Sequence, residues 1–177
     1  VQPVLVALNS ECKSHQNISL YVHVPHCPSL CYFCACNKVI SRDSNDRDRY
    51  VDALSQELRL LRAQLADDSQ IVQVHLGGGS PSYLSIDQIK KLEVAIGATL
   101  PLAQDTERSI ELDPRTYSQE QGELLFKHGY ARASLGVQDF DPVVQEIVNR
   151  QQPYELTRNV YESLREIGFS GINFDLI

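Results

Sequence analysis

The chain has 177 residues, 42% of them apolar and 22% charged, and its 16 basic and 23 acidic side chains give a net charge of −7. This length supports one domain with a sizeable core, and this composition excludes a disordered polyelectrolyte. The acidic balance argues against broad, sequence-independent nucleic-acid binding, which requires basic surface. The sequence has neither a secretory leader nor the run of about 20 apolar residues that a membrane span needs. We therefore expect neither nucleic acid nor a membrane as a partner.

The two ends of the sequence suggest that it is a piece of a longer protein. It contains no methionine, and its last residues, from Phe174 to Ile177, are typical of a strand with no turn after it. A bare apolar edge strand favours aggregation. We expect a lead-in segment at residues 1–18 and one incomplete domain at residues 19–177.

A strand and helix alternation follows the lead-in segment. Residues 19–24 predict a strand that Pro25 ends. Apolar residues then recur every three or four positions from Tyr50 to Leu65, which predicts an amphipathic helix with Asp46 as a candidate N-cap. The remaining predicted strands are 71–76, 109–112, 132–137 and 172–177, and the remaining predicted helices are 86–96, 118–128, 142–149 and 154–167, with stops at Gly129 and Gly168.

This alternation predicts an α/β fold with a parallel sheet and right-handed crossovers. A doubly wound sheet and a (β/α) barrel both fit the pattern. A full eight-stranded barrel needs about 250 residues, so any barrel here is partial.

Polar residues, glycines or cysteines lie at, near or just after the ends of the predicted strands. In (β/α) folds the carboxyl ends of parallel strands build the site, so these residues are expected at one rim, although polar loops at strand ends are also common. They are Cys27, Gly77 to Gly79, Glu111 with Asp113, and Gln138 with Asp139; Asp175 lies on the fifth strand.

Four of the five cysteines lie within ten residues. This crowding favours a metal or cluster site over a disulfide framework. Cys27, Cys31 and Cys34 form a CxxxCxxC motif, and Cys36 follows, whereas Cys12 stands apart and is expected to be a free thiol. Structural zinc is an alternative, but it usually takes four ligands as two separated pairs. Three thiolates on one loop suit an iron–sulfur cluster that leaves one iron open.

The CxxxCxxC motif after the first strand, with Phe33 before the third cysteine, resembles the signature of the radical S-adenosylmethionine (SAM) superfamily. The resemblance implies a partial (β/α) barrel, truncated here after about five units. It implies a [4Fe-4S] cluster held by Cys27, Cys31 and Cys34, with SAM at the open iron. In that superfamily an electron cleaves SAM to methionine and a 5′-deoxyadenosyl radical.

Cys36-Asn37 after the motif and the strand from Tyr21 to Pro25 before it resemble the oxygen-independent coproporphyrinogen III oxidase family. Val24 and His26 stand where that family more often has Ile and Phe. The resemblance implies oxidative decarboxylation of two propionates of coproporphyrinogen III to vinyl groups, giving protoporphyrinogen IX. It also implies that Cys36 is not a ligand, that an electron donor is required, and that the full-length protein is a cytoplasmic monomer.

The glycine run Gly77-Gly78-Gly79 permits close backbone approach to a ligand, although alone it is also typical of a tight turn. The run resembles the glycine motif of the superfamily, and the resemblance implies that it binds the amino group of the methionine part of SAM. Glu111 matches a partner of the SAM ribose, and Asp113, before a proline, is interpreted as a turn residue.

The resemblance also implies a second SAM molecule beside the first. Arg150 is alternatively a surface ion-pair residue. His23 is a candidate catalytic residue, but a histidine on a strand is more often a hydrogen-bonded core residue. No catalytic residue is therefore assigned from the sequence. His15, His75 and His128 receive no role. The matches to first-SAM contacts are Tyr21 and Glu111, and those to second-SAM contacts are Phe33, Gly78, Gly79, Gln138, Arg150 and Asp175.

Rival interpretations are a haem-binding chaperone of related sequence and another radical SAM enzyme, such as a methyltransferase. Chaperone relatives generally lack the fourth cysteine and the asparagine after it, whereas Cys36 and Asn37 are present here.

Overall fold

The computed structural model describes residues 17–99 and 101–177. Cys12, His15 and nearly all of the predicted lead-in segment lie outside these residues. Within the described residues, five parallel strands form the main sheet, in the order β1-β4-β5-β6-β7. These strands are β1 (Asn17–Val24), β4 (Gln70–Gly78), β5 (Leu102–Leu112), β6 (Arg132–Gln138) and β7 (Gly171–Leu176).

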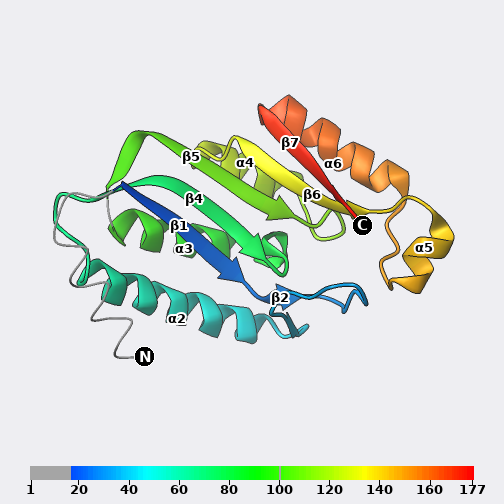
Figure 1. Cartoon of the computed structure of the whole chain (residues 1–177), viewed down its shortest axis with the longest axis horizontal. Helices are drawn as coiled ribbons and strands as arrows, with labels where there is room; N and C mark the ends of the chain where they lie inside the picture. Colours follow the sequence, from blue (N-terminus) through cyan, green and yellow to red (C-terminus); the bar gives the residue numbers. More distant parts are fainter. Residues whose placement is uncertain (1–16, 100) are drawn as a thin grey trace.

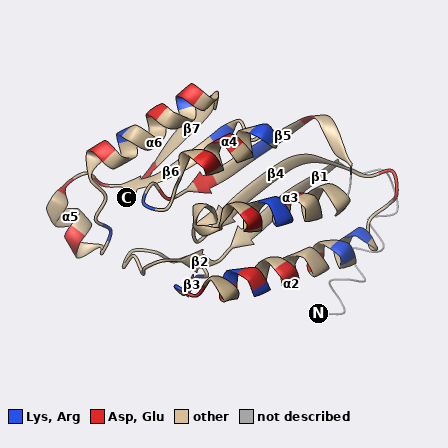
Figure 2. Ribbon diagram, turned by 180° about the vertical axis from the view of Figure 1, so that it is seen from behind, with Lys and Arg blue, Asp and Glu red and all other residues tan. Residues whose placement is uncertain are grey.

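The helices run between these strands and lie on one side of the sheet (Figures 1 and 2). Charged residues are spread along these helices (Figure 2). The helices are α2 (Ser44–Arg62), α3 (Ile86–Thr99), α4 (Gln119–Lys127), α5 (Pro142–Ile147) and α6 (Tyr154–Ile167). A short 3₁₀ turn, η1 (Pro81–Tyr83), follows β4, and β2 (His26–Cys27) pairs with β3 (Val39–Ile40).

The strand order decides between the two architectures that the sequence left open. A doubly wound sheet reverses its strand order at a switch point, with helices on both faces. Here the five strands of the main sheet are neighbours in the order in which they follow one another along the chain, without reversal, and the helices share one face. The fold is therefore α/β of the partial (β/α) barrel type, as predicted.

Alternation along the strands separates the core from the functional face. On β1, Val22 and Val24 are buried against the helices, while Tyr21 and His23 point to the opposite face. The same alternation buries Ile110 and Leu112 on either side of Glu111 on β5. The core is built from such strand residues and from the inward faces of the helices, among them Val51, Leu58, Leu92, Ile96, Leu125, Val160 and Leu164.

Most helix ends follow the predicted local chemistry. Ser118 caps α4 in a reciprocal capping box with Gln121. Gly129 and Gly168 adopt positive φ angles of 87° and 118° just beyond α4 and α6. The predicted N-cap of α2 was wrong: the Asp43 side chain accepts the backbone N–H of Asn45, and α2 begins at Ser44.

Two strand boundaries also differ from the prediction. β5 begins at Leu102 rather than at residue 109. Its pairing with β4 is irregular between Leu102 and Glu107, so the strand accommodates the extra polar residues between these two positions. β4 extends through Gly77 and Gly78, which pair with His23 and Val24 of β1, so only Gly79 lies beyond the strand. In the described part of the chain, each helix is too short or too polar to cross a membrane.

Candidate iron–sulfur and SAM site

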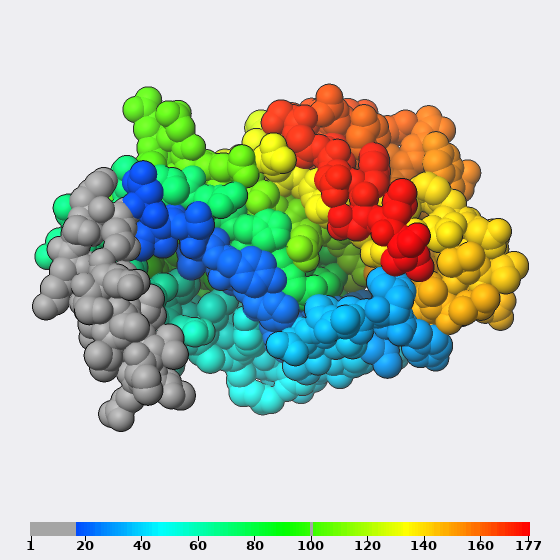
Figure 3. Space-filling model, in the orientation of Figure 1, coloured from blue at the N-terminus to red at the C-terminus, as the bar shows by residue number. Residues whose placement is uncertain are grey.

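The cysteine loop follows β1 and is hydrogen-bonded to the segment that follows α5. The backbone N–H of Tyr32 donates to the Val148 carbonyl at 3.0 Å, and the Asn149 amide donates to the Leu30 carbonyl at 2.6 Å. In the space-filling view the light-blue loop therefore lies beside the yellow segment that follows β6 (Figure 3). This contact joins the first and fourth strand–helix units around one opening.

One cavity lies at that opening, at the carboxyl end of the sheet. Cys27, Cys31 and Cys34 all line it. Most of the predicted cofactor-contacting residues line the same cavity: Phe33, Gly78, Gly79, Glu111, Gln138, Arg150 and Asp175. The structure thus brings together residues from the cysteine loop and from four strands of the sheet, while their individual roles stay predictions.

Two of the predicted residues lie just outside this cavity lining. Tyr21 is 55% exposed on the open face of β1, where its ring stacks on His75 with centroids 5.7 Å apart. Gly77 lies one residue before the lining glycines, and a Cβ there would come within 3.0 Å of the Glu111 carboxylate.

The glycines leave room that any side chain would fill. A Cβ on Gly79 would lie 2.7 Å from the Pro25 carbonyl and 2.9 Å from the Cys27 sulfur. Gly78 has a φ of 111°, and a Cβ there would lie 2.6 Å from the His23 ring. Both positions require glycine, so this segment is more than an ordinary turn.

Glu111 sits between the glycines and a histidine. Its Oε2 accepts the backbone N–H of Gly78 at 2.9 Å, and its Oε1 lies 3.3 Å from His75 Nε2. Nδ1 of His75 lies 2.7 Å from the Ser109 hydroxyl. His75, which received no role from the sequence, thus helps to orient Glu111, the predicted partner of the SAM ribose. The sequence signal that could have identified His75 was its position two residues before the glycine run.

Both ring nitrogens of His23 have partners. Nδ1 lies 3.0 Å from the Tyr21 hydroxyl, and Nε2 lies 2.8 Å from the Asn37 carbonyl oxygen. This arrangement ties β1 to the residue that follows the fourth cysteine. It favours the hydrogen-bonded interpretation of His23 over the catalytic one.

The surroundings of two of the thiols favour their protonated form when no metal is bound. Burial raises the pKa of Cys27 to about 12, and neighbouring thiols add to the effect. Burial likewise raises the pKa of Cys36 to about 11, with its sulfur 3.0 Å from that of Cys34. Both thiols therefore favour the protonated form at neutral pH, and a metal bound by Cys27 would displace the proton of that thiol. Among residues 17–99 and 101–177, no three His, Cys, Asp or Glu side chains are gathered for a single metal ion.

The donor set and the cavity fit the cofactors that the sequence implies. Three thiols from one loop open onto one cavity, and Gly79 keeps space beside the Cys27 sulfur. Thiolates are the usual ligands of iron–sulfur clusters. Carboxylate, amide and guanidinium groups on the opposite wall suit a ligand with hydroxyl, amino and carboxylate groups.

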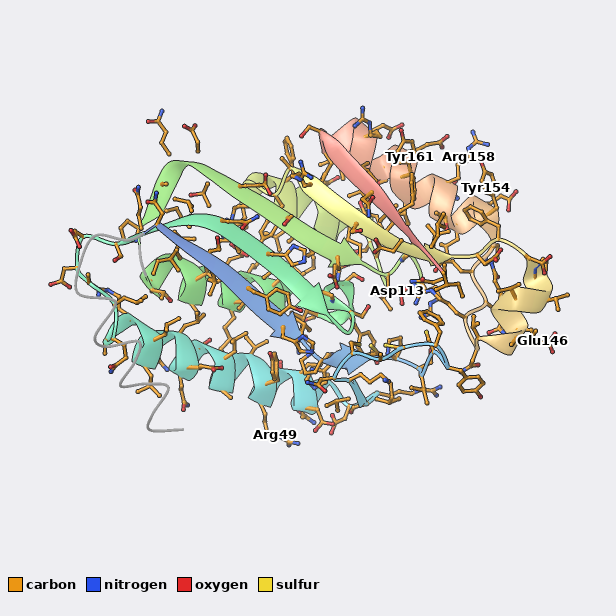
Figure 4. The ribbon with its side chains drawn as sticks, viewed as in Figure 1. Arg49, Asp113, Glu146, Tyr154, Arg158 and Tyr161 are labelled. Carbon is orange, nitrogen blue, oxygen red and sulfur yellow. The ribbon has the colours of Figure 1, made fainter. Side chains whose placement is uncertain are left out.

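Asp113 has a larger part in the site than the sequence suggested. Its Oδ1 accepts the backbone N–H of Arg115 at 3.0 Å, so the predicted turn role holds. It also pairs with the guanidinium groups of Arg115 and Arg150, at the cavity edge where Figure 4 labels it. Burial alone would raise the pKa of Asp113, but the hydrogen bond and the charges of these arginines lower it below its usual value. Arg150 is 7% exposed, which excludes a surface ion pair.

The far wall of the cavity comes from β6 and β7. Gln138 ends β6 with a φ of 74°, a strained conformation for a residue other than glycine. The Asp175 carboxylate on β7 accepts the Ser134 hydroxyl at 2.8 Å and the Asn173 amide at 2.9 Å. These bonds fix one carboxylate at the cavity, and strain at Gln138 is typical of a functional site.

Comparisons with known proteins agree with this geometry. The family described as the Radical SAM superfamily matches residues 21–177. Oxygen-independent coproporphyrinogen III oxidase from Salmonella typhimurium is 44% identical over 160 residues, which are 90% of this chain and 35% of that protein. The enzyme of the same name from Pseudomonas aeruginosa is 41% identical over 175 residues, which are 98% of this chain and 38% of that protein.

A solved structure is similar over almost the whole chain. Coproporphyrinogen III oxidase from Escherichia coli, described as a radical SAM enzyme, superposes with a TM-score of 0.92 at 40% identity. The match covers 99% of this chain and 40% of that protein. The chain therefore spans well under half the length of these relatives.

Proposed function

Because the chain belongs to the radical SAM superfamily, we propose that it is the catalytic core of an oxygen-independent coproporphyrinogen III oxidase. The proposed reaction is the oxidative decarboxylation of two propionates of coproporphyrinogen III to vinyl groups. Relatives with that name are 39 to 44% identical over at least 90% of the chain. The observation that carries the proposal is the single cavity shared by Cys27, Cys31, Cys34, Gly79 and Glu111.

The roles proposed for the residues follow from their chemistry. The thiolates of Cys27, Cys31 and Cys34 hold the cluster. The Glu111 carboxylate, fixed by the Gly78 N–H, accepts hydrogen bonds from the ribose hydroxyls of SAM. When bound, a [4Fe-4S] cluster and SAM supply reductive SAM cleavage and hydrogen-atom abstraction from the substrate.

Further residues are proposed to orient SAM and a second SAM molecule. Arg150 offers a guanidinium for a carboxylate, and Gln138 and Asp175 offer an amide and a carboxylate from neighbouring strands. Phe33, 38% exposed at the cavity, offers an apolar ring. Tyr21, through its contacts with His23 and His75, borders the open face of the sheet where a porphyrinogen would approach.

The decisive experiment uses the full-length parent protein under anaerobic conditions. With reductant and SAM it is expected to convert coproporphyrinogen III to protoporphyrinogen IX, and the Cys34→Ser variant is expected not to. Tight haem binding without turnover would contradict the proposal and favour a chaperone. SAM cleavage without decarboxylation would favour another radical SAM reaction. The electron donor, a cytoplasmic location and a monomeric state belong to the proposal and rest on the resemblance.

A further inference from the structure

A buried carboxylate holds two arginines behind the cysteine loop. Asp113 is 7% exposed. Arg115 donates to it from Nη2 at 2.7 Å and from Nε at 3.0 Å. Arg150 approaches the same carboxylate with Nη2 at 3.2 Å and Nη1 at 3.3 Å. The carboxylate therefore fixes the orientation of both guanidinium planes.

Both guanidinium groups also reach the sulfur of Cys31. Nη2 of Arg115 lies 3.7 Å from that sulfur, and Nη1 of Arg150 lies 3.6 Å from it. Cys31 is 8% exposed, so these N–H donors meet the sulfur in a shielded environment. Two positive charges and one negative charge leave a single positive charge beside the thiol, and charges interact more strongly away from water.

The two arginines differ in what else they do. Arg150 donates from Nη2 to the Gly136 carbonyl at 2.7 Å and is proposed above to bind SAM. Arg115 is 17% exposed in its side chain and is tied to Asp113 through its own backbone and side chain. Its side-chain hydrogen bonds go to Asp113 and to the Cys31 sulfur, but Arg115 also lines the cavity proposed to hold SAM. Its effect on the cluster is therefore measured in the absence of SAM.

We propose that Arg115, oriented by Asp113, donates an N–H to the Cys31 thiolate and raises the reduction potential of the cluster. The inference rests on the proposed function, because it requires the cluster. Reduction adds negative charge to a cluster, and hydrogen bonds to its sulfurs together with nearby positive charge stabilise the reduced form. Arg115 thus makes the first electron transfer to the cluster easier.

The test is a redox titration of the anaerobically reconstituted chain, followed by electron paramagnetic resonance without SAM. Arg115→Gln removes the charge and is expected to give a more negative midpoint potential at unchanged iron content. Arg115→Lys keeps the charge but loses the planar fork, so its potential is expected between those of the two other proteins. Arg47→Gln is the control, because Arg47 is also buried but stacks on Tyr83, 4.2 Å from the ring centre.

The outcomes separate this inference from the proposed function. Equal potentials in the wild-type chain, Arg115→Gln and Arg115→Lys would overturn the inference and leave the cluster assignment intact. An equally large shift in Arg47→Gln would also overturn it, since the effect would then be one of general charge. A wild-type chain that assembles no iron–sulfur cluster would contradict the proposed function itself.

Discussion

Glu111 on β5 accepts a hydrogen bond at 2.9 Å from the backbone N–H of Gly78 at the end of β4. The bond orients the carboxylate and uses the glycine backbone at a φ that other residues rarely adopt. One element of the predicted SAM site therefore positions another. The relationship makes the proposed contact with the ribose testable by a small substitution.

Glu111→Gln is expected to weaken SAM binding by about ten- to a hundredfold. Hydrogen bonds to charged groups contribute about 1.5 to 3 kcal/mol, and about 1.4 kcal/mol corresponds to a factor of ten. Calorimetric titration of SAM into the reconstituted chain measures the change. Glu123→Gln on the exposed face of α4, where Glu123 pairs with Gln119, is the control and is expected to leave affinity unchanged. Equal affinity in the Glu111 variant would remove its assigned role.

Cys34 and Cys36 allow a test of which cysteines bind the cluster. Their sulfurs lie only 3.0 Å apart, but only Cys34 belongs to the CxxxCxxC motif and lines the cavity. Cys36→Ser is therefore expected to keep about four irons per chain after anaerobic reconstitution, the content of one [4Fe-4S] cluster. Cys34→Ser is expected to lose the cluster, as shown by iron analysis and visible absorption. Equal loss in both variants would show that the ligands are wrongly assigned.

The glycine next to Cys27 offers a steric test. In Gly79→Ala the new methyl group would meet the Pro25 carbonyl at 2.7 Å and the Cys27 sulfur at 2.9 Å. Overpacking of this kind costs about 1 to 3 kcal/mol and would displace the sulfur, so cluster assembly is expected to fall by more than half. Iron content and visible absorption after reconstitution measure it.

Gly97 provides the matched control on α3. A Cβ there meets nothing within 4 Å, and glycine within a helix is less stable than alanine. Gly97→Ala is expected to keep the cluster and to raise the free energy of unfolding by about 0.5 to 1 kcal/mol. If Gly79→Ala assembled as much cluster as Gly97→Ala, the close approach at Gly79 would have no functional meaning.

The sequence predicted the strand and helix order and most of the cavity lining because both depend on local patterns. Strand ends placed Glu111 and Gln138 at the rim, and the cysteine and glycine motifs placed their own residues there as well. It could not predict that Asp113 joins Arg115 and Arg150 across Cys31, because that contact depends on how the fourth unit packs on the first. Competing polar residues also misplaced the N-cap, since Asp43 and Asp46 are equally suitable by type.

A buried ion pair far from the cysteine loop tests how the sheet and helices are held together. Glu93 on α3 pairs with Arg108 on β5 at 2.8 Å, with side chains 1% and 6% exposed. The Tyr130 hydroxyl donates to the same carboxylate at 2.8 Å, and burial together with the Glu93 charge raises the pKa of Tyr130 well above its ordinary value. The guanidinium and the hydroxyl thus share this carboxylate, and Arg108 also donates to the His128 carbonyl oxygen.

Glu93→Gln is expected to lower the free energy of unfolding by about 3 to 5 kcal/mol, because it leaves the Arg108 guanidinium charged and without its carboxylate partner away from water. Urea unfolding of the reconstituted chain measures the change in midpoint at constant slope. The control is Glu162→Gln on α6, which breaks an exposed pair with Arg158 and is expected to change stability by less than about 0.5 kcal/mol. Similar small losses in both variants would mean that the buried pair is no more stabilising than the exposed one.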